Sequence, residues 1–294
     1  MIDLDAAPRP SPCRTFYARP RAHGQGFPAA RPRGPVRWKT PSIAATTPYD
    51  TIGSTYAATR AADPRLATVI QEVLADARRV VNVGAGTGNY EPTDREVVAV
   101  EPSAVMISQR RTDAAPAVLA PAEHLPFDDD TFDASLAVST VHHWTDRARG
   151  LAEMARVAPH RVVVHWEPAD TTLHWIVEDY FPELAAIESV RGGGTSEDVA
   201  AELGGTVEVH PFPVPIDFTE GSGGAFWGRP EALLDPRVRS GISMFALLDP
   251  GVVDRGVTRL AADLASGRWD DRHGHLRTLD ALDVGYRLVV STAT

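Results

Sequence analysis

The sequence predicts an α/β fold built on a doubly wound parallel sheet. Three observations support this prediction. Apolar runs of strand length alternate with segments of helical periodicity through the middle of the chain, as they do where helices connect parallel strands. The first of these runs, residues 80–83, leads directly into three glycines at alternate positions. The next run, residues 97–100, ends on an acid, Glu101, and this pair of strand ends is typical of a nucleotide site.

The predicted helices have recognisable starts and ends. Asp63 and Pro64 are an N-cap and a first-turn proline, and apolar side chains then recur at the three-four spacing of one buried stripe. Ser103 is placed to cap a second helix, and Thr195 opens a capping sequence for another that ends at Gly204. Further helices are expected around residues 151–157, 173–181 and 257–264. The predicted strands are residues 80–83, 97–100, 117–119, 132–138, 161–166, 206–209 and 286–290.

The glycine loop after the first strand indicates a small nucleotide ligand. Glycine lets the backbone turn sharply and come close to a bound group. Glu101, at the tip of the second strand, is placed to hold a ribose, since a carboxylate accepts from both hydroxyls of the diol. The dinucleotide fingerprint requires glycine at the sixth loop position, which here is Asn89, so the pattern favours a compact mononucleoside over NAD. A tight turn without function is the alternative interpretation.

Composition excludes several classes of partner. The 294 residues include 29 basic and 39 acidic ones, a net charge of −10 that is unfavourable for binding nucleic acid. The single cysteine, Cys13, forbids an intramolecular disulfide and fits a reducing cytoplasm. No apolar run approaches the roughly 18 residues of a membrane span. We therefore expect a cytoplasmic protein that acts on neither nucleic acid nor membrane, with an oligomeric state that the sequence does not indicate.

The chain divides into an extension and one domain. Residues 1–47 are rich in proline and arginine, and between Ala6 and Tyr49 there is no acid, so we expect this extension to be disordered. A transit peptide is a weaker alternative because the prolines oppose its amphipathic helix, and a functionless extension from an earlier start of translation is another. Residues 48–294 form the predicted domain. Its cap and acceptor-pocket elements are expected at about 48–62, 169–195 and 215–283.

These motifs resemble the ubiquinone-methylase-like (type 11) class I methyltransferases, which use S-adenosylmethionine. The resemblance covers about residues 48–168 and is carried by four segments: residues 84–88, 101–103, 122–127 and 142–144. It implies a Rossmann-like seven-stranded sheet with a helical cap and a C-terminal insertion, in which the last strand lies antiparallel between the fifth and sixth. Two positions depart from the family pattern. Asn82 stands where an acid is common and Pro121 where an aspartate usually stands, so each lacks a charge that could anchor the cofactor.

The resemblance also assigns residues to the cofactor. The glycine loop would face the methionine part, Glu101 would hold the ribose, and Met106 with the Ala122-Glu123 pair would flank the adenine. Tyr56 and Arg60, four residues apart and so on one face of a helix, would lie over the cofactor and substrate, or else belong to a surface helix. The predicted cofactor-binding residues are Gly84, Ala85, Gly86, Gly88, Glu101, Pro102, Met106, Ala122, Glu123, Val138, Ser139, Tyr56 and Arg60.

His142 and His143 are the predicted catalytic residues. They follow the fourth predicted strand, and in open parallel sheets the ligand lies off the carboxyl ends of the strands. Methyl transfer from a sulfonium is a direct displacement that needs alignment and, where the acceptor must lose a proton, a base. Histidine can accept that proton near neutral pH. The alternative is that the two histidines and Trp144 only pack the loop. No metal partner at ligand spacing is evident, and Asp128–Asp130 is read as a solvated turn.

The predicted function is transfer of a methyl group from S-adenosylmethionine to a small-molecule acceptor. The aromatic residues of the expected cap favour an apolar or cyclic acceptor, of the kind made in secondary metabolism. The sequence does not indicate whether oxygen, nitrogen or carbon accepts the methyl group. Two alternatives remain open: an NAD(P)-dependent oxidoreductase, and a non-catalytic nucleoside-binding module.

Overall fold

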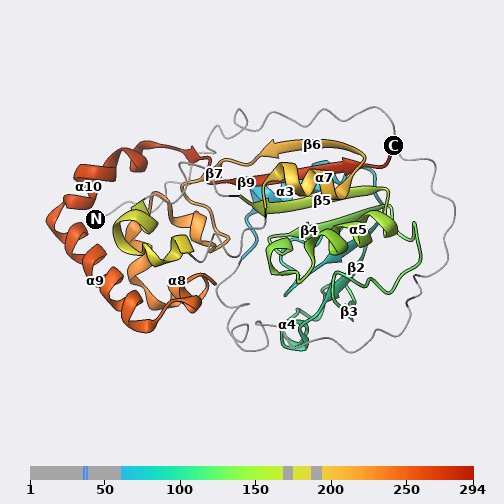
Figure 1. Cartoon of the computed structure of the whole chain (residues 1–294), viewed down its shortest axis with the longest axis horizontal. Helices are drawn as coiled ribbons and strands as arrows, with labels where there is room; N and C mark the ends of the chain where they lie inside the picture. Colours follow the sequence, from blue (N-terminus) through green and yellow to red (C-terminus); the bar gives the residue numbers. More distant parts are fainter. Residues whose placement is uncertain (1–35, 37, 39–60, 168–174, 187–193) are drawn as a thin grey trace, which may run out of the picture.

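A computed structural model describes residues 36, 38, 61–167, 175–186 and 194–294. Its centre is a seven-stranded sheet of order β3-β2-β1-β4-β5-β9-β6 (Figure 1). The strands are β1 (Arg79–Val83), β2 (Glu96–Glu101), β3 (Ala117–Leu119), β4 (Ala134–Val138), β5 (His160–Trp166), β6 (Thr206–Pro211) and β9 (Tyr286–Thr292). β9 lies between β5 and β6 and runs antiparallel to both. The predicted α/β sheet, including the antiparallel strand, is confirmed.

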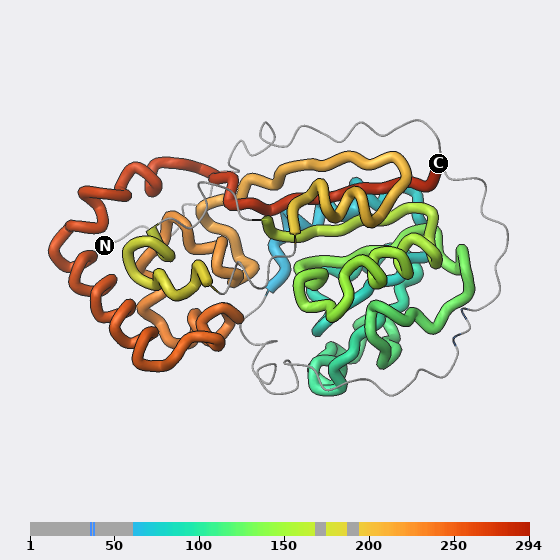
Figure 2. Tube along the Cα trace, viewed as in Figure 1, coloured from blue at the N-terminus to red at the C-terminus, as the bar shows by residue number. Residues whose placement is uncertain are grey.

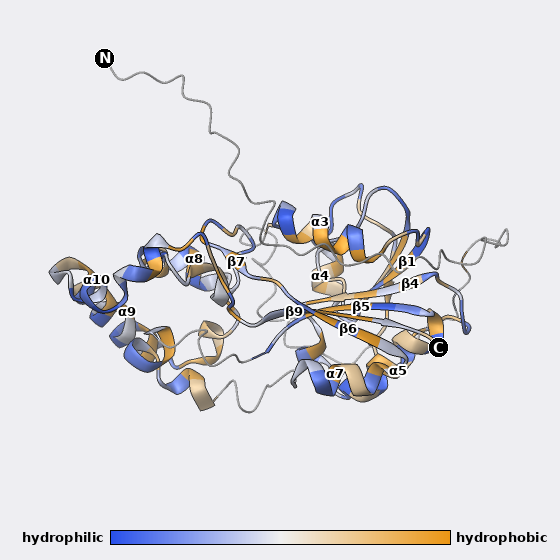
Figure 3. Ribbon diagram, turned by 90° about the horizontal axis from the view of Figure 1, so that it is seen from above, coloured by the Kyte–Doolittle hydropathy of each residue, from blue (hydrophilic) through white to orange (hydrophobic). Residues whose placement is uncertain are grey.

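Helices cover both faces of this sheet. Figure 3 shows α3 (Pro64–Val73) on one side, and α5 (Arg147–Val157) and α7 (Ser196–Leu203) on the other. The caps expected from the sequence form: the Asp63 side chain accepts from the N–H of Arg65, and Thr195 and Asp198 make a reciprocal capping box. A short helix, α4 (Ala104–Ser108), follows β2 and is capped by the Ser103 side chain.

One crossover departs from the predicted alternation of strands and helices. Residues 84–95 connect β1 to the parallel strand β2 through turns and bends, with no helix. A parallel crossover usually needs a dozen or more residues and commonly carries a helix. This connection is at that lower limit and is rich in glycine, proline and other turn residues, so a helix does not fit. The glycine loop is therefore held by something other than a following helix.

The cap lies at the carboxyl edge of the parallel strands. Figure 2 shows the chain leaving the sheet after β6, winding through the cap and returning along β9. Tyr286, the first residue of β9, pairs with Trp166, the last of β5, so the insertion starts and ends at this edge. The cap elements are η4 (Trp175–Tyr180), β7 (Val214–Pro215), η5 (Gly223–Phe226), η6 (Pro230–Leu234), α8 (Pro236–Ser240), η7 (Phe245–Leu247), α9 (Pro250–Ser266), α10 (Arg268–His273), η8 (Gly274–Thr278) and β8 (Ala281–Leu282).

The cap interior is continuous with the core of the sheet. Buried side chains on the α3 face, such as Leu66 and Leu136, belong to the same apolar cluster as Trp175 and Trp269 of the cap. The rings of these two tryptophans meet edge to face at 5.4 Å between centroids. The segment around η4, which the sequence suggested as a lid or as ordinary core, is a π-helix in its described part, with most of its apolar side chains in this core.

Two buried carboxylates tie η4 to the last cap helices. Asp179 accepts from Arg272 at 2.6 Å and lies 2.7 Å from Nε2 of His273. Asp263 accepts from the hydroxyl of Tyr180 at 3.1 Å and pairs with an arginine of α10. Buried charges that are paired and hydrogen-bonded fix geometry, because breaking one pair leaves the other charge uncompensated.

In the described ranges no helix is both long and apolar enough to cross a membrane.

His165 is a buried, neutral histidine near the carboxyl end of β5. Its Nε2 lies 3.3 Å from the hydroxyl of Ser196, and its Nδ1 has no hydrogen-bond partner among the described residues. Burial lowers the pKa of His165 from 6.5 to about 4, although the nearby Glu167 acts in the opposite direction. The folded protein therefore resists protonation of this ring.

This shift predicts a pH-dependent free energy of unfolding. Between pH 6.5 and about 4 the unfolded chain binds a proton at residue 165 that the folded chain does not, so stability should fall as the pH is lowered through this window and level off below it. The loss should reach about 3 kcal/mol. Urea unfolding of the wild type and of His165→Gln across this window measures it, since other acid-sensitive groups affect both proteins equally. Parallel curves for the two proteins would contradict the assignment.

Candidate active site

The glycine loop at the end of β1 has a backbone that requires glycine. Gly84, Gly86 and Gly88 have φ angles of +68°, +52° and +92°, in the left-handed region that side chains disfavour. At Gly84 space is also closed, because a Cβ there would overlap the side chain of Thr140, which follows β4. The loop and the end of β4 are thus in direct contact.

Four of the five N–H groups of this loop, residues 84–88, donate to groups inside the protein. Those of Gly84 and Ala85 donate to the carbonyl of Val100 at 2.8 and 3.0 Å, and that of Gly88 donates to Ala85. The N–H of Gly86 donates to Glu101 at 2.8 Å. A pyrophosphate would find neither these donors nor the N-terminus of a following helix, which together form the usual anion site of dinucleotide folds. The loop therefore suits a ligand that needs close approach more than a phosphate.

Glu101 is buried and held from two sides. Oε2 accepts from Gly86, and Oε1 accepts from the N–H of Ser103 at 2.9 Å. A carboxylate only accepts hydrogen bonds, which is the chemistry that the hydroxyls of a ribose require. Met106, on α4, is buried, and its methyl group lies 3.4 Å from the position that a Cβ of Gly86 would take. The structure thus brings the loop, Glu101 and Met106 together, with Pro102 between the acid and the helix.

Ala122 and Glu123 lie in different settings. Ala122 is buried, whereas the Glu123 carboxylate accepts from the N–H of Asp146, the N-cap of α5, at 3.0 Å. The Glu123 carbonyl also accepts from Arg149 at 2.9 Å. The contacts of Glu123 therefore hold the start of α5, and an adenine contact from this pair rests more naturally on Ala122.

The two histidines sit on a strained turn after β4. Ser139 has a φ of +51°, which is uncommon for a residue other than glycine, and such strain concentrates at functional sites. Val138 and Ser139 are half-buried, and a short 3-10 turn, η3 (Val141–His143), follows them. The half-buried rings of His142 and His143 are in contact, with centroids 3.8 Å apart and ring planes tilted by 52°.

Trp144 closes this turn. It packs where a Cβ of Gly150, on α5, would otherwise lie, so the turn is anchored to the helix below the site. Tyr56 and Arg60 lie outside the described residues.

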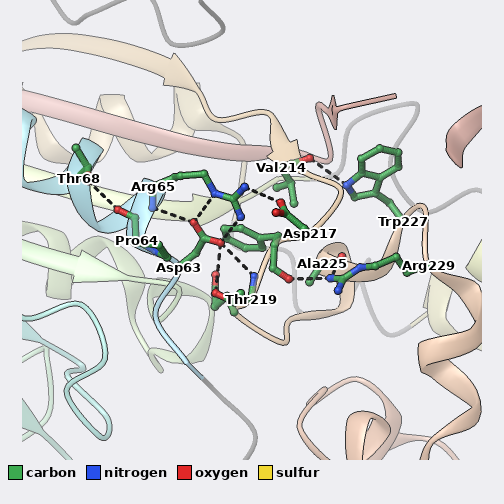
Figure 4. A network of polar contacts seen from close by, with 12 residues as sticks. Asp63, Pro64, Arg65, Thr68, Val214, Asp217, Thr219, Ala225, Trp227 and Arg229 are labelled. Atoms are coloured by element: carbon green, nitrogen blue, oxygen red, sulfur yellow. Dashed lines mark hydrogen bonds and ion pairs between the residues drawn. The ribbon is translucent and has the colours of Figure 1, made fainter. Parts of the chain in front are cut away.

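A polar network joins the start of α3 to the cap (Figure 4). The buried carboxylate of Asp63 accepts hydrogen bonds from the guanidinium of Arg65 at 2.7 Å and from the N–H of Thr219 at 3.1 Å. The same guanidinium also donates to Asp217 at 2.6 Å. Burial alone would raise the pKa of Asp63, but its hydrogen bonds with Arg65 and Thr219 lower it. The backbone N–H of Asp63 donates to the hydroxyl of Tyr90 at 3.1 Å. The start of α3 therefore contacts Tyr90, which follows the glycine loop.

A buried acid of the cap meets this loop as well. Both Tyr90 and Tyr286 donate to Oε2 of Glu220, at 3.4 and 3.3 Å, and Tyr286 also lies 2.5 Å from the hydroxyl of Ser222. These residues were not among the predicted site residues. They stand far apart in the sequence, so no spacing pattern could have indicated them.

Within the ranges that the structure describes, no group of three or more histidine, cysteine or acidic side chains is placed to hold a metal ion.

Comparison with known proteins identifies the family of the chain. The family model described as "Methyltransferase domain" matches residues 81–161. An uncharacterized methyltransferase of Mycobacterium tuberculosis is 41% identical over 113 residues, which is 35% of this chain and 46% of the relative. YcgJ, an uncharacterized methyltransferase of Bacillus subtilis, is 28% identical over 134 residues, 40% of this chain and 53% of the relative. The chain thus matches about half the length of these curated relatives.

A solved structure is similar over its whole length. It is a protein of Anabaena variabilis described as a methyltransferase from an antibiotic biosynthesis pathway. The two chains are 30% identical with a TM-score of 0.74, and the match covers 80% of this chain and 99% of the other. The chain belongs to the class I S-adenosylmethionine-dependent methyltransferases, an enzyme family, and its cofactor is S-adenosylmethionine.

Proposed function

We propose that the chain transfers the methyl group of S-adenosylmethionine to a small-molecule acceptor of secondary metabolism. The observation that carries the proposal is the contact between the glycine loop and the buried Glu101, at the sheet edge that the cap adjoins. The similarity to a protein described as part of an antibiotic biosynthesis pathway supports the metabolic setting. The bound cofactor supplies an electrophilic methyl group on a positively charged sulfur.

In this proposal the chain's own residues orient the cofactor. Glu101 accepts from the ribose hydroxyls, because a carboxylate is an acceptor for both hydroxyls of a diol. The bare Cα surfaces of Gly84 and Gly86 let the methionine part lie against the backbone. Met106 and Ala122 border the adenine. Pro102, Val138 and Ser139 complete the walls as predicted binding residues.

The cap is proposed to hold the acceptor and exclude water. Its core is rich in aromatic side chains, which favours an apolar or cyclic molecule. Excluding water strengthens the electrostatic interactions around a sulfonium that loses its charge in the transition state. The net charge of −10 argues against a nucleic acid as acceptor.

His142 or His143 is proposed as the base for an acceptor that must lose a proton. Both stand on the turn that follows β4, and Thr140 of the same turn packs against Gly84 of the cofactor loop. A half-buried imidazole can take a proton and return it to solvent. The used N–H groups of the glycine loop argue against the oxidoreductase alternative.

Glu101→Gln should weaken binding of both S-adenosylmethionine and S-adenosylhomocysteine by about 10- to 100-fold. The variant loses a charged acceptor and turns an amide NH₂ toward Gly86 or Ser103, and hydrogen bonds to charged groups are worth about 1.5–3 kcal/mol. Calorimetric titration measures the affinities. Glu96→Gln, at the other end of β2 in a half-exposed pair with Arg79, is the matched control and should bind like the wild type. Equal affinity of Glu101→Gln and wild type, or binding of NADH instead, would overturn the cofactor assignment.

Replacing the catalytic histidine by glutamine should lower the methyl-transfer rate by about 10²- to 10⁴-fold without changing cofactor affinity. The single variants His142→Gln and His143→Gln identify which ring acts, with S-adenosylhomocysteine release as the readout in a screen of small acceptors. His124→Gln, an exposed histidine on another loop, is the control. A double variant that keeps the wild-type rate would show that the rings only pack the turn.

A further inference from the structure

The absent helix between β1 and β2 leaves open what holds the glycine loop in place. A following helix would fix such a loop through its own backbone hydrogen bonds. Here a buried ion pair, Glu91 with Arg110, lies against the loop instead. The Arg110 guanidinium is 2.7 and 2.8 Å from the two carboxylate oxygens of Glu91. A Cβ at Gly88 would lie 3.1 Å from Glu91 and 3.2 Å from Arg110.

Both members of this pair bond to the neighbouring segments as well as to each other. Arg110 also donates to the carbonyl of Gly86 at 3.1 Å and to that of Ala115 at 3.0 Å. Glu91 accepts from the N–H of Ala115 and from the side chain of Asn82, each at 3.3 Å. The end of β1, where Asn82 replaces the acid common in the family, thus still meets a carboxylate.

The burial of the pair calls for a reason. The side chains of Arg110 and Glu91 are 5% and 7% exposed, and removing two charges from water is costly enough that such pairs often add little stability. A planar guanidinium, however, can reach a carboxylate and two carbonyls at fixed angles, which an apolar pair cannot do. The arrangement is suited to setting geometry.

Gly86 is the point where this geometry reaches the cofactor site. Its carbonyl is held by Arg110, and its N–H donates to Glu101, so the two groups of this one residue link the ion pair to the ribose-binding acid. We propose that Glu91 and Arg110 are positioning residues: they replace the missing helix, fix the Gly86 backbone and thereby orient the Glu101 carboxylate. The inference rests on the proposed function, in which Glu101 holds the ribose.

The alternative is that the pair only stabilises the fold. The double variant Glu91→Gln/Arg110→Met separates the two roles, because it leaves neither charge of the pair unpaired while removing the Arg110 donor to the Gly86 carbonyl. Arg110→Lys keeps the charge but loses the planar fork. The chain offers a matched control in the next residue: Arg111→Met, whose guanidinium is 81% exposed and pairs with an exposed Asp113.

The experiment measures two quantities for each full-length variant: affinity for S-adenosylhomocysteine by calorimetry, and thermal unfolding of the free protein. The double variant should unfold near the wild-type temperature yet bind on the order of tenfold more weakly, as expected if the binding geometry of the loop falls to about a tenth of the population. Arg110→Lys should bind S-adenosylhomocysteine with an affinity between those of the wild type and the double variant. Arg111→Met should match the wild type.

Wild-type affinity in a double variant that folds would overturn the inference. Should the double variant fail to fold, Arg110→Lys decides: weaker binding at an unchanged unfolding temperature supports positioning, and unchanged binding overturns it. Failure of the wild type itself to bind S-adenosylhomocysteine and S-adenosylmethionine would refute the proposed function instead, so the two failures are distinguishable.

Discussion

The hydrogen bond from the N–H of Gly86 to the carboxylate of Glu101 is the contact on which the proposed cofactor site depends. It requires β1 and β2 to end side by side, and their parallel register, in which Val83 pairs with Val100, provides this. The strands are buried and apolar, so slipping the register would cost core packing as well as this contact. A chemical feature of the site is thus set by the packing of the sheet.

The cap extends the same principle to the other side of the site. Because its aromatic interior is continuous with the core on the α3 face, it behaves as part of the domain more than as an attached module. Polar contacts reinforce this at two places. Asp63 links α3 to the loop before η5. The carboxylate of Glu220 accepts hydrogen bonds from the hydroxyls of Tyr90, beside the glycine loop, and Tyr286, on β9. The position of the cap is therefore tied to the glycine loop.

Local patterns predicted the elements and the chemistry that local patterns can carry. The seven strands, the caps at Asp63, Ser103 and Thr195, and the closeness of Glu101 to the glycines follow from periodicity, capping chemistry and the rule that parallel strands end at one edge. The absent helix after β1 was not foreseen, because the turn residues there were interpreted as a nucleotide loop alone.

Contacts between distant residues left no trace in the sequence. Glu91 with Arg110, and Tyr90 with Glu220 and Tyr286, meet only because the fold brings them together. A single sequence shows an acid and an arginine nineteen positions apart with no periodic reason to pair. The roles of the assigned site residues, Tyr56 and Arg60 included, stay predictions.

The contact between Gly84 and Thr140 has a consequence for how the enzyme meets its ligands. The turn that carries His142 adopts an unfavourable backbone at Ser139, and the side chain of Thr140 in the same turn fills the space beside Gly84. The glycine loop and this turn therefore cannot shift independently, because a close-packed interior transmits a displacement from one contact to the next. In the proposed function, a change of backbone in either loop would displace the methyl donor and the proposed base together.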